Sequence, residues 1–276
     1  MHDVPTLLLS SVLLLAPAVA APGDVATRNN ACRQALARAD YPTAEAMCHA
    51  ALAVAEQRAP HTPEHAVALN SLAVLAYTQG AYAQAEQLFQ RALAIQEQVL
   101  GPQHPDVAMT LNNLGRLAAT QGAYAQAKQL FQRALAIAEP ALGPAHRDLA
   151  TILHNLAVLA YTQGDYAQAE QLFQRALAMR EQVLGPQHPE VATTLTALAA
   201  LYDTQGDQAQ AAALCYRAVA IREHILGAAH PATQAARALL EGILAKLGSK
   251  HLEHLGTRAW RDAHALPHQH GQAAVC

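Results

Sequence analysis

The chain has 276 residues, of which 52% are hydrophobic, 4% are aromatic and 14% are charged. That share of apolar side chains excludes a disordered protein and predicts a core of Ala, Leu and Val, residues that suit closely packed helices. The formal net charge of −3 excludes a broad basic surface for nucleic acid.

An apolar run over residues 6–16 is followed by Pro17 and then by Ala18-Val19-Ala20. This order is typical of a secretory signal peptide, so we expect residues 1–20 to be removed after Ala20. The run is shorter than the about 20 apolar residues that cross a bilayer, so we expect no stable membrane insertion of the mature chain. No Lys or Arg precedes the run, which leaves a buried N-terminal helix as the alternative. Export, to the periplasm or the medium, would place the protein in an oxidising compartment.

The middle of the chain is a tandem repeat. Residues 78–108 and 162–192 are identical at 27 of 31 positions, and a third copy lies midway, so the period is 42 residues. A degenerate copy precedes these three and a weaker copy follows them. The predicted units are 25–60, 64–101, 106–143, 148–185 and 190–227, and a cap helix is expected over 231–247.

Each unit contains two helical patterns separated by a turn. In the second unit, apolar residues recur at helical spacing before and after Gly80, which is free to adopt a positive φ. Leu100-Gly101-Pro102 ends the second helix, and Pro105 begins the next unit. A lone helical hairpin cannot bury its apolar face, so the copies are expected to stack into an all-α solenoid.

These residues resemble the tetratricopeptide repeat. The resemblance rests on Leu69-x-x-Leu72-Ala73, Gly80-x-Tyr82-x-x-Ala85 and Phe89-x-x-Ala92-Leu93, and the Leu-Gly-Pro-x-His-Pro ending is similar to the kinesin-light-chain subgroup. It implies a right-handed α-α superhelix whose first helices line a concave groove. It also implies a scaffold or adaptor that binds a protein or peptide, without catalysis and without a cofactor.

The resemblance also implies which side chains face the groove. They are polar or aromatic residues of the first helices: Asn70, Tyr77, Asn112, Asn113, Arg116, His154, Asn155 and Tyr161, with Asn29, Asn30, Arg33, Ser71, Thr196 and Asp203 at matching positions. A ladder of Asn amides can bond the backbone of an extended peptide, and Arg33 and Arg116 can pair with carboxylates. His154 could do so only when protonated. The alternative is that the Asn side chains bond one another between adjacent helices.

Two further features bear on the kind of partner. The early positions of two first helices carry the neutral residues Met109 and Thr151, so we expect no clamp for a C-terminal carboxylate. A stripe of arginines recurs on the second helices, at Arg91, Arg133, Arg175 and Arg217. We interpret it as a solvated convex face whose side-chain stems lie on apolar surface, with binding of an anionic surface as the alternative.

The chain has four cysteines. Cys32 and Cys48 lie eight residues before and after Asp40, at equal height on the two helices of a predicted hairpin, and we expect a disulfide between them. The alternative is two buried thiols. Cys215 occupies a packing position, and Cys276 ends the chain.

Most of the 15 histidines follow the repeat. One lies in each inter-repeat loop, too far apart to share a metal ion: His104, His146, His188 and His230. The tail, residues 249–276, is predicted to be largely disordered and carries His264, His268 and His270, which could bind Zn or Cu. Nucleotide-binding and hydrolase motifs are missing, so we expect no enzyme. Metal binding by the tail and self-assembly of the repeats are the alternatives to a scaffold.

Overall fold

The structure is a computed structural model that describes residues 24–58 and 60–247. This part of the chain is a series of eleven α-helices without a strand, which confirms the all-α prediction. The predicted signal peptide and tail lie outside the described residues. The helices are α1 (Val25–Ala37), α2 (Tyr41–Arg58), α3 (Pro63–Thr78), α4 (Tyr82–Val99), α5 (Pro105–Thr120), α6 (Tyr124–Leu142), α7 (Arg147–Thr162), α8 (Tyr166–Leu184), α9 (Pro189–Gln205), α10 (Gln208–Leu226) and α11 (Pro231–Leu247).

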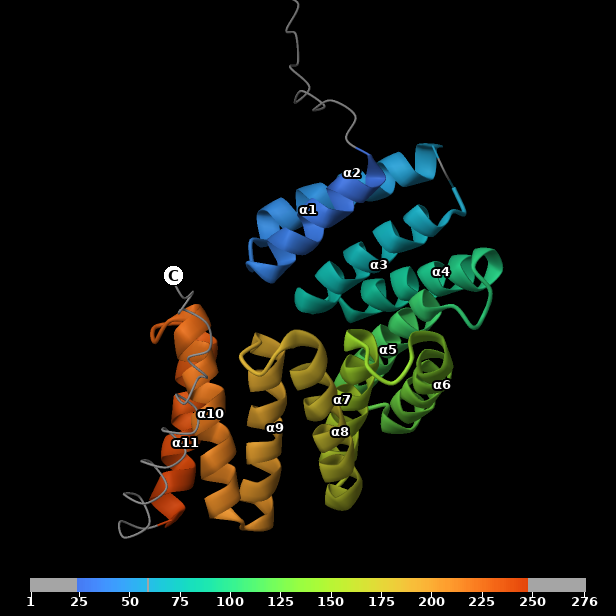
Figure 1. The fold of residues 1–276 in the computed structure, drawn as a ribbon. Coiled ribbons are helices and arrows are strands. Elements are labelled where there is room, and N and C mark those ends of the chain that lie inside the picture. The colour runs from blue at the N-terminus through green and yellow to red at the C-terminus, as the bar shows by residue number, and fades with distance from the viewer. Residues whose placement is uncertain (1–23, 59, 248–276) are drawn as a thin grey trace, which may run out of the picture.

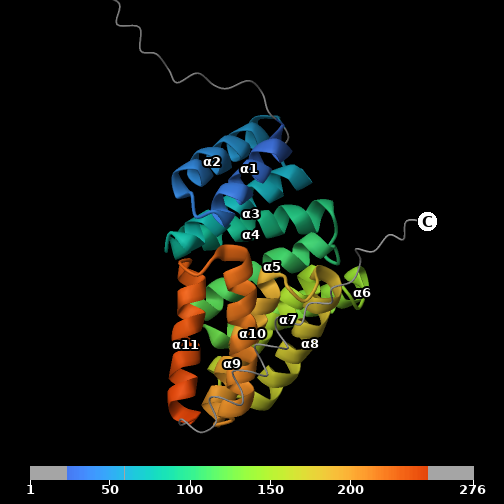
Figure 2. The ribbon, with the colours of Figure 1, turned by 60° about the vertical axis from the view of Figure 1, so that its left-hand side comes forward.

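The helices form hairpins that stack in chain order. Within the described residues, each helix packs only on the helices one or two places away along the chain. Figures 1 and 2 show α1 and α2 at one end, α10 and α11 at the other, and helix axes that change direction between the ends. Because contacts are confined to neighbours, the protein is a solenoid rather than a globule with one central core.

The turn inside each hairpin explains the repeated glycine. Gly80 and its counterparts in the next three hairpins adopt φ between 78° and 86°. This conformation is unfavourable for any residue that carries a Cβ atom. In the first hairpin the same turn is made by Ala39, at φ 56°. The degenerate first unit is therefore strained where its successors are not.

In the three middle hairpins, the paired helices pack around one buried aromatic ring each. Phe89, Phe131 and Phe173 are at most 2% exposed. Phe131 packs against Gly115 of α5, where a Cβ would lie 2.7 Å from Cε1 of the ring.

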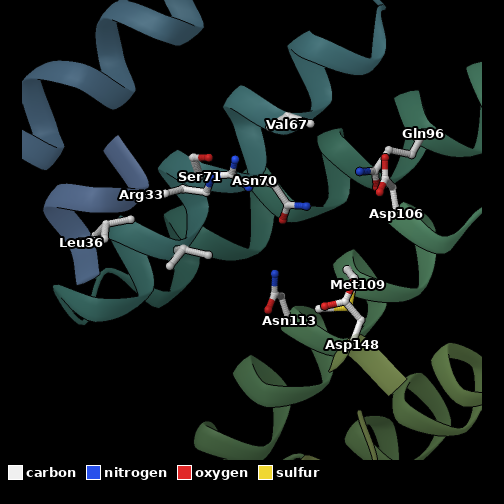
Figure 3. Close-up of a pocket in the computed structure, with 11 residues that line it drawn as sticks. Arg33, Leu36, Val67, Asn70, Ser71, Gln96, Asp106, Met109, Asn113 and Asp148 are labelled. Carbon is white, nitrogen blue, oxygen red and sulfur yellow. The ribbon is translucent and has the colours of Figure 1, made fainter. Parts of the chain in front are cut away.

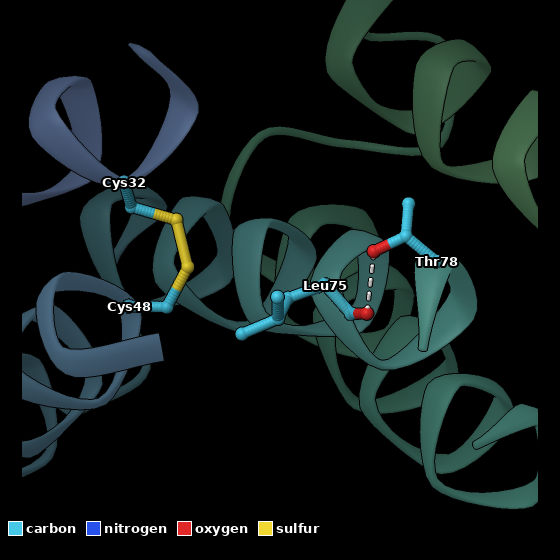
Figure 4. Close-up of a disulfide and its surroundings, with 4 residues drawn as sticks. All are labelled: Cys32, Cys48, Leu75 and Thr78. Carbon is cyan, nitrogen blue, oxygen red and sulfur yellow. Dashed lines mark hydrogen bonds between the residues drawn. A yellow bond between two sulfur atoms is a disulfide. The ribbon is translucent and has the colours of Figure 1, made fainter. Parts of the chain in front are cut away.

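The first hairpin replaces this ring with the pair Cys32 and Cys48. Their Cα atoms lie 5.2 Å apart and their sulfurs are joined across α1 and α2. Both residues are fully buried, in the same cluster as Leu75 of α3 (Figure 4). The predicted pairing is thus compatible with the geometry, and its oxidation in solution remains a prediction. Cys215 is buried with a free thiol, and burial raises its pKa to about 11.

Helix α11 covers the last hairpin. Its buried residues Ala236, Leu240 and Ile243 pack on the preceding helices, while Arg237 and Lys246 pair outward with Glu223 and Asp203. An apolar inner face with a charged outer face suits the last helix of the described solenoid, because within residues 24–247 no further repeat covers it. A search of the described helices finds none that meets the length and hydropathy needed to cross a membrane.

Candidate functional site: the first-helix face

The first helices of the hairpins lie side by side along one face of the stack. We call the surface formed by α1, α3, α5, α7 and α9 the first-helix face. Successive members contact one another, so side chains from different repeats meet there. All of the residues predicted to face a ligand lie on these helices.

Several predicted amides bond between adjacent repeats. Nδ2 of Asn70 donates to Oγ1 of Thr110 at 2.6 Å, and Nδ2 of Asn155 donates to Oδ1 of Asn112 at 2.8 Å. Asn112 is only 1% exposed, so it supports helix stacking rather than contact with a ligand. Asn113 is partly exposed and makes no hydrogen bond within the described part of the chain. The bonds of Asn70, Asn112 and Asn155 thus agree with the alternative of bonding between adjacent helices, and contact between Asn113 and a ligand stays a prediction.

The predicted tyrosines form a second ladder, at the C-terminal ends of the first helices. The hydroxyl of Tyr77 bonds to Oγ1 of Thr120, and that of Tyr161 bonds to Oγ1 of Thr204, each at 2.9 Å. The guanidinium of Arg116 lies 5.1 Å above the ring of Tyr77, a cation–π distance. These pairs fix the spacing of neighbouring first helices and leave one ring face and one guanidinium near the surface.

His154 does not provide the positive charge that would let it pair with a carboxylate. Its ring lies 5.3 Å from the ring of Phe173, and burial, aided by the charges of Arg180 and Arg116, lowers its pKa to about 3. The imidazole is therefore neutral near neutral pH. The prediction from sequence missed this because the same position holds Asn in two other units.

The remaining predicted groove residues divide between core and surface. Asn29 and Ser71 are buried. Arg33 is exposed and donates to Oδ1 of Asn30 at 2.6 Å. The hydroxyl of Thr196 bonds to its own helix, and Asp203 pairs with Lys246 of the cap helix.

The first-helix face is hollowed by a pocket of about 470 Å³ (Figure 3). Its walls come from five helices, so it exists only in the assembled stack. The lining residues are Arg33, Leu36, Val67, Asn70, Ser71, Val74, Gln96, Asp106, Met109, Asn113 and Asp148. We call it the α3–α5 pocket. A second pocket of about 270 Å³ follows along the same face and includes Tyr77, Arg116, Asn155 and Val158.

Comparison with known proteins agrees with this architecture. The tetratricopeptide repeat model matches residues 25–98, 66–140, 107–182 and 148–224. The chain belongs to the tetratricopeptide repeat family. Tetratricopeptide domains generally mediate interactions between proteins or serve as scaffolds. Comparison with curated protein sequences finds no match.

Solved tetratricopeptide structures share the fold at low sequence identity. BtubC (BKLC) from P. vanneervenii is 21% identical, with 92% of this chain and 96% of that chain covered and a TM-score of 0.62. A kinesin-light-chain-type protein of Podosopora anserina, with nearly identical TPR-like repeats, is 21% identical over 72% of this chain and 95% of that chain, at a TM-score of 0.56. A thermophilic tetratricopeptide protein of Thermus thermophilus is 20% identical over 80% of this chain and 99% of that chain, at a TM-score of 0.58. At this identity the likeness shows the fold alone.

The arginine stripe of this tetratricopeptide solenoid is paired rather than free. Each arginine meets a glutamate of the preceding second helix: Arg91 with Glu56, Arg133 with Glu97, Arg175 with Glu139 and Arg217 with Glu181. Such pairs between exposed side chains contribute about 0–1 kcal/mol each. Because each guanidinium has its carboxylate, the pairs weaken the alternative of an anionic-surface site.

The inter-repeat histidines have a structural role that the sequence analysis did not identify. Nδ1 of His104, His146 and His188 accepts a backbone N–H of the following helix, at 3.1, 3.1 and 3.2 Å. Each imidazole thereby caps a first helix and satisfies one of its free amides. Among the described residues no group of three metal-ligating side chains occurs, and the histidines of the predicted tail site lie outside these residues.

Sequence analysis missed Gln96, Asp106 and Asp148 of the α3–α5 pocket. Gln96 comes from a second helix, whereas the resemblance assigned the groove to first helices. The available signal was the departure from the repeat, because Gln96 stands where the following unit has Ala138.

Proposed function

We propose that this protein is a non-enzymatic scaffold that binds a peptide or protein segment along its first-helix face. The α3–α5 pocket carries the proposal, because it is continuous across several repeats and combines apolar walls with amide groups. A rigid stack holds these groups in place before binding, so a ligand does not bear the cost of ordering the site.

A substitution that fills the pocket tests this function. Met109 lines the pocket and is partly exposed, so Met109→Arg is expected to block the pocket while the fold is retained. Gln98→Arg adds the same charge at an exposed position of α4 and serves as the matched control. Proteins captured from the exported fraction by the wild type and by Gln98→Arg should be lost with Met109→Arg. Equal capture by all three proteins would show that the pocket is not the binding site.

We also propose that the protein is exported. The apolar run over residues 6–16, followed by Ala18-Val19-Ala20, supports export, and an oxidising compartment suits the close approach of Cys32 and Cys48. The test is expression of the full chain in a bacterium, followed by fractionation and N-terminal sequencing. Periplasmic or secreted protein beginning at residue 21 is expected. A full-length chain confined to the cytoplasm would refute the proposal.

A further inference from the structure

The junction between the second and third repeats contains buried polar side chains whose hydrogen bonds are only partly satisfied. Oγ1 of Thr110 accepts from Asn70 and donates to Oε1 of Gln96, both at 2.6 Å. Gln96 is 2% exposed, yet its Nε2 has no acceptor within the described residues. Oδ1 of Asn70 is buried and also lacks a partner there. Both side chains line the α3–α5 pocket, and the Gln96 nitrogen points toward it (Figure 3).

These free groups match a peptide backbone. The nitrogen and oxygen of each amide could also be exchanged. Gln96 would then donate to Thr110, and Thr110 would donate to Asn70. Because a Thr hydroxyl donates only one hydrogen bond, one amide nitrogen and one amide oxygen would still lack a partner. A buried polar atom without a partner, such as Oδ1 of Asn70, destabilises the protein. A ligand that offers one carbonyl and one N–H would remove that cost, and an extended peptide offers both at every residue.

The positions of Gln96 and Thr110 hold a different pair of residues at each of the next two junctions. One period later, the positions of Gln96 and Thr110 hold Ala138 and Ile152, which bury no polar side chain. Two periods later they hold Arg180 and Thr194, and there Nη1 of Arg180 donates to Oγ1 of Thr194 at 2.6 Å. Among these three positions, Gln96 is thus the one that holds an amide. Between α5 and α7, Nδ2 of Asn112 and Oδ1 of Asn155 also have no partner within the described residues.

The charge of the pocket points to a basic side chain in the ligand. Asp106 and Asp148 lie at one end of the pocket (Figure 3), and within the described residues neither forms an ion pair with a Lys or Arg. Each has a capping imidazole 3.8 Å from its carboxylate, and the Nδ1 atom of that imidazole accepts a backbone N–H. Asp148 is also attracted by the charge of Arg147, whose guanidinium bonds Glu190. At the equivalent position two repeats after Asp106, Glu190 is bonded by Arg147 and lies near Arg180.

We propose that the α3–α5 pocket binds an extended peptide segment that carries a Lys or Arg side chain, an inference that rests on the proposed function. The cation lies between Asp106 and Asp148. The backbone bonds to Gln96 and Asn70. Arg33 is at the opposite end of the pocket, where it already bonds Asn30 and does not neutralise the two carboxylates.

The test uses the purified protein and a phage-displayed library of random peptides. The wild type should select peptides enriched in Lys or Arg. A synthetic peptide from that pool should bind about fivefold more weakly to Asp106→Asn/Asp148→Asn, because two partly exposed ion pairs are lost. Glu45→Gln/Glu241→Gln removes the same charge from exposed positions elsewhere and should leave binding unchanged.

A second variant tests the backbone contacts. Gln96→Ala/Thr110→Ile introduces the residues that the next junction already holds, so the fold should be retained. It should weaken binding of the same peptide about fivefold or more, since the hydrogen bond between the Gln96 amide and the peptide backbone is lost. Thermal unfolding of every variant checks that the fold is unchanged.

Each result decides between defined alternatives. Selection of acidic or apolar peptides, no selection at all, or binding unaffected by the Asp substitutions would overturn the inference. In those cases the effect of Met109→Arg on partner capture still decides the proposed function separately. If Met109→Arg has no effect on capture, the groove itself is refuted.

Discussion

Reduction of the disulfide between Cys32 and Cys48 is expected to destabilise the first hairpin selectively. The bridge closes a loop with a sequence separation of 16. In the chain-entropy description, opening such a loop costs about 3 kcal/mol of unfolding free energy. Helices α1 and α2 contact no helix beyond α3 in the described residues, so the loss should be confined to residues 25–58.

The equivalent residues of the second unit suggest a substitution that should restore the stability lost without the disulfide. Cys32 and Cys48 stand where the second unit has Ala73 and Phe89, and Phe89 is 2% exposed. Cys32→Ala/Cys48→Ala should lose about 3 kcal/mol, as reduction does. Cys32→Ala/Cys48→Phe rebuilds the pair of the second unit and should regain about 2 kcal/mol through burial of the ring.

The assay combines urea unfolding with amide hydrogen exchange, each with and without reductant. Thiol counting should find two free cysteines in the oxidised chain, Cys215 and Cys276, and four after reduction. Cys215→Ala is the control, because it leaves the bridge intact and should keep the response to reductant. A change below about 1 kcal/mol, or faster exchange spread evenly over all hairpins, would refute the reasoning.

Three further predictions follow from single sites. Ala39→Gly should stabilise the protein by about 0.5–1 kcal/mol in urea unfolding, because Ala39 adopts φ 56°; destabilisation would show that the turn is not strained. Arg180→Ala should cost about 1–3 kcal/mol, since it removes the buried donor to Oγ1 of Thr194 and to the carbonyl of Glu190, while Arg147 still bonds the Glu190 carboxylate. Adding Thr194→Ile should recover part of that loss in free energy of unfolding. No recovery would contradict the claim that the hydroxyl of Thr194 needs Arg180 as its partner. For His154, the folded pKa of about 3 lies below the unfolded value, so the unfolded state binds the extra proton. Stability should therefore fall as pH drops from about 6.5 toward 3, by at most roughly 1.4 kcal/mol per pH unit. His154→Asn should flatten this slope in unfolding measured across that range, and an unchanged slope would show that another group titrates.

The fold could be predicted from the sequence because its determinants are local. Helical spacing and Gly80 with its counterparts act over a few residues, and each hairpin then packs only on the next. The repeat also placed Asn70, Asn113 and Arg33 on the first helices correctly. These features need no knowledge of distant contacts.

The use of each side chain could not be predicted in the same way. Asn112 and Asn113 are adjacent in sequence. Asn112 accepts a hydrogen bond from Asn155, 43 residues away, whereas Asn113 lines a pocket. Near-identical repeats present the same local pattern at every junction. Which amide lacks a hydrogen-bond partner depends on single residues that differ from the repeat pattern, such as Gln96. It also depends on the side chains that face them from the adjacent repeat.

The sequence by itself thus determined a stack of helical hairpins, since periodicity and turn chemistry are encoded within each unit. Only the tertiary structure decided which polar and charged groups remain available to a ligand. Hydrogen bonds and ion pairs between repeats join residues up to 43 positions apart, and their geometry exists only once the helices have packed.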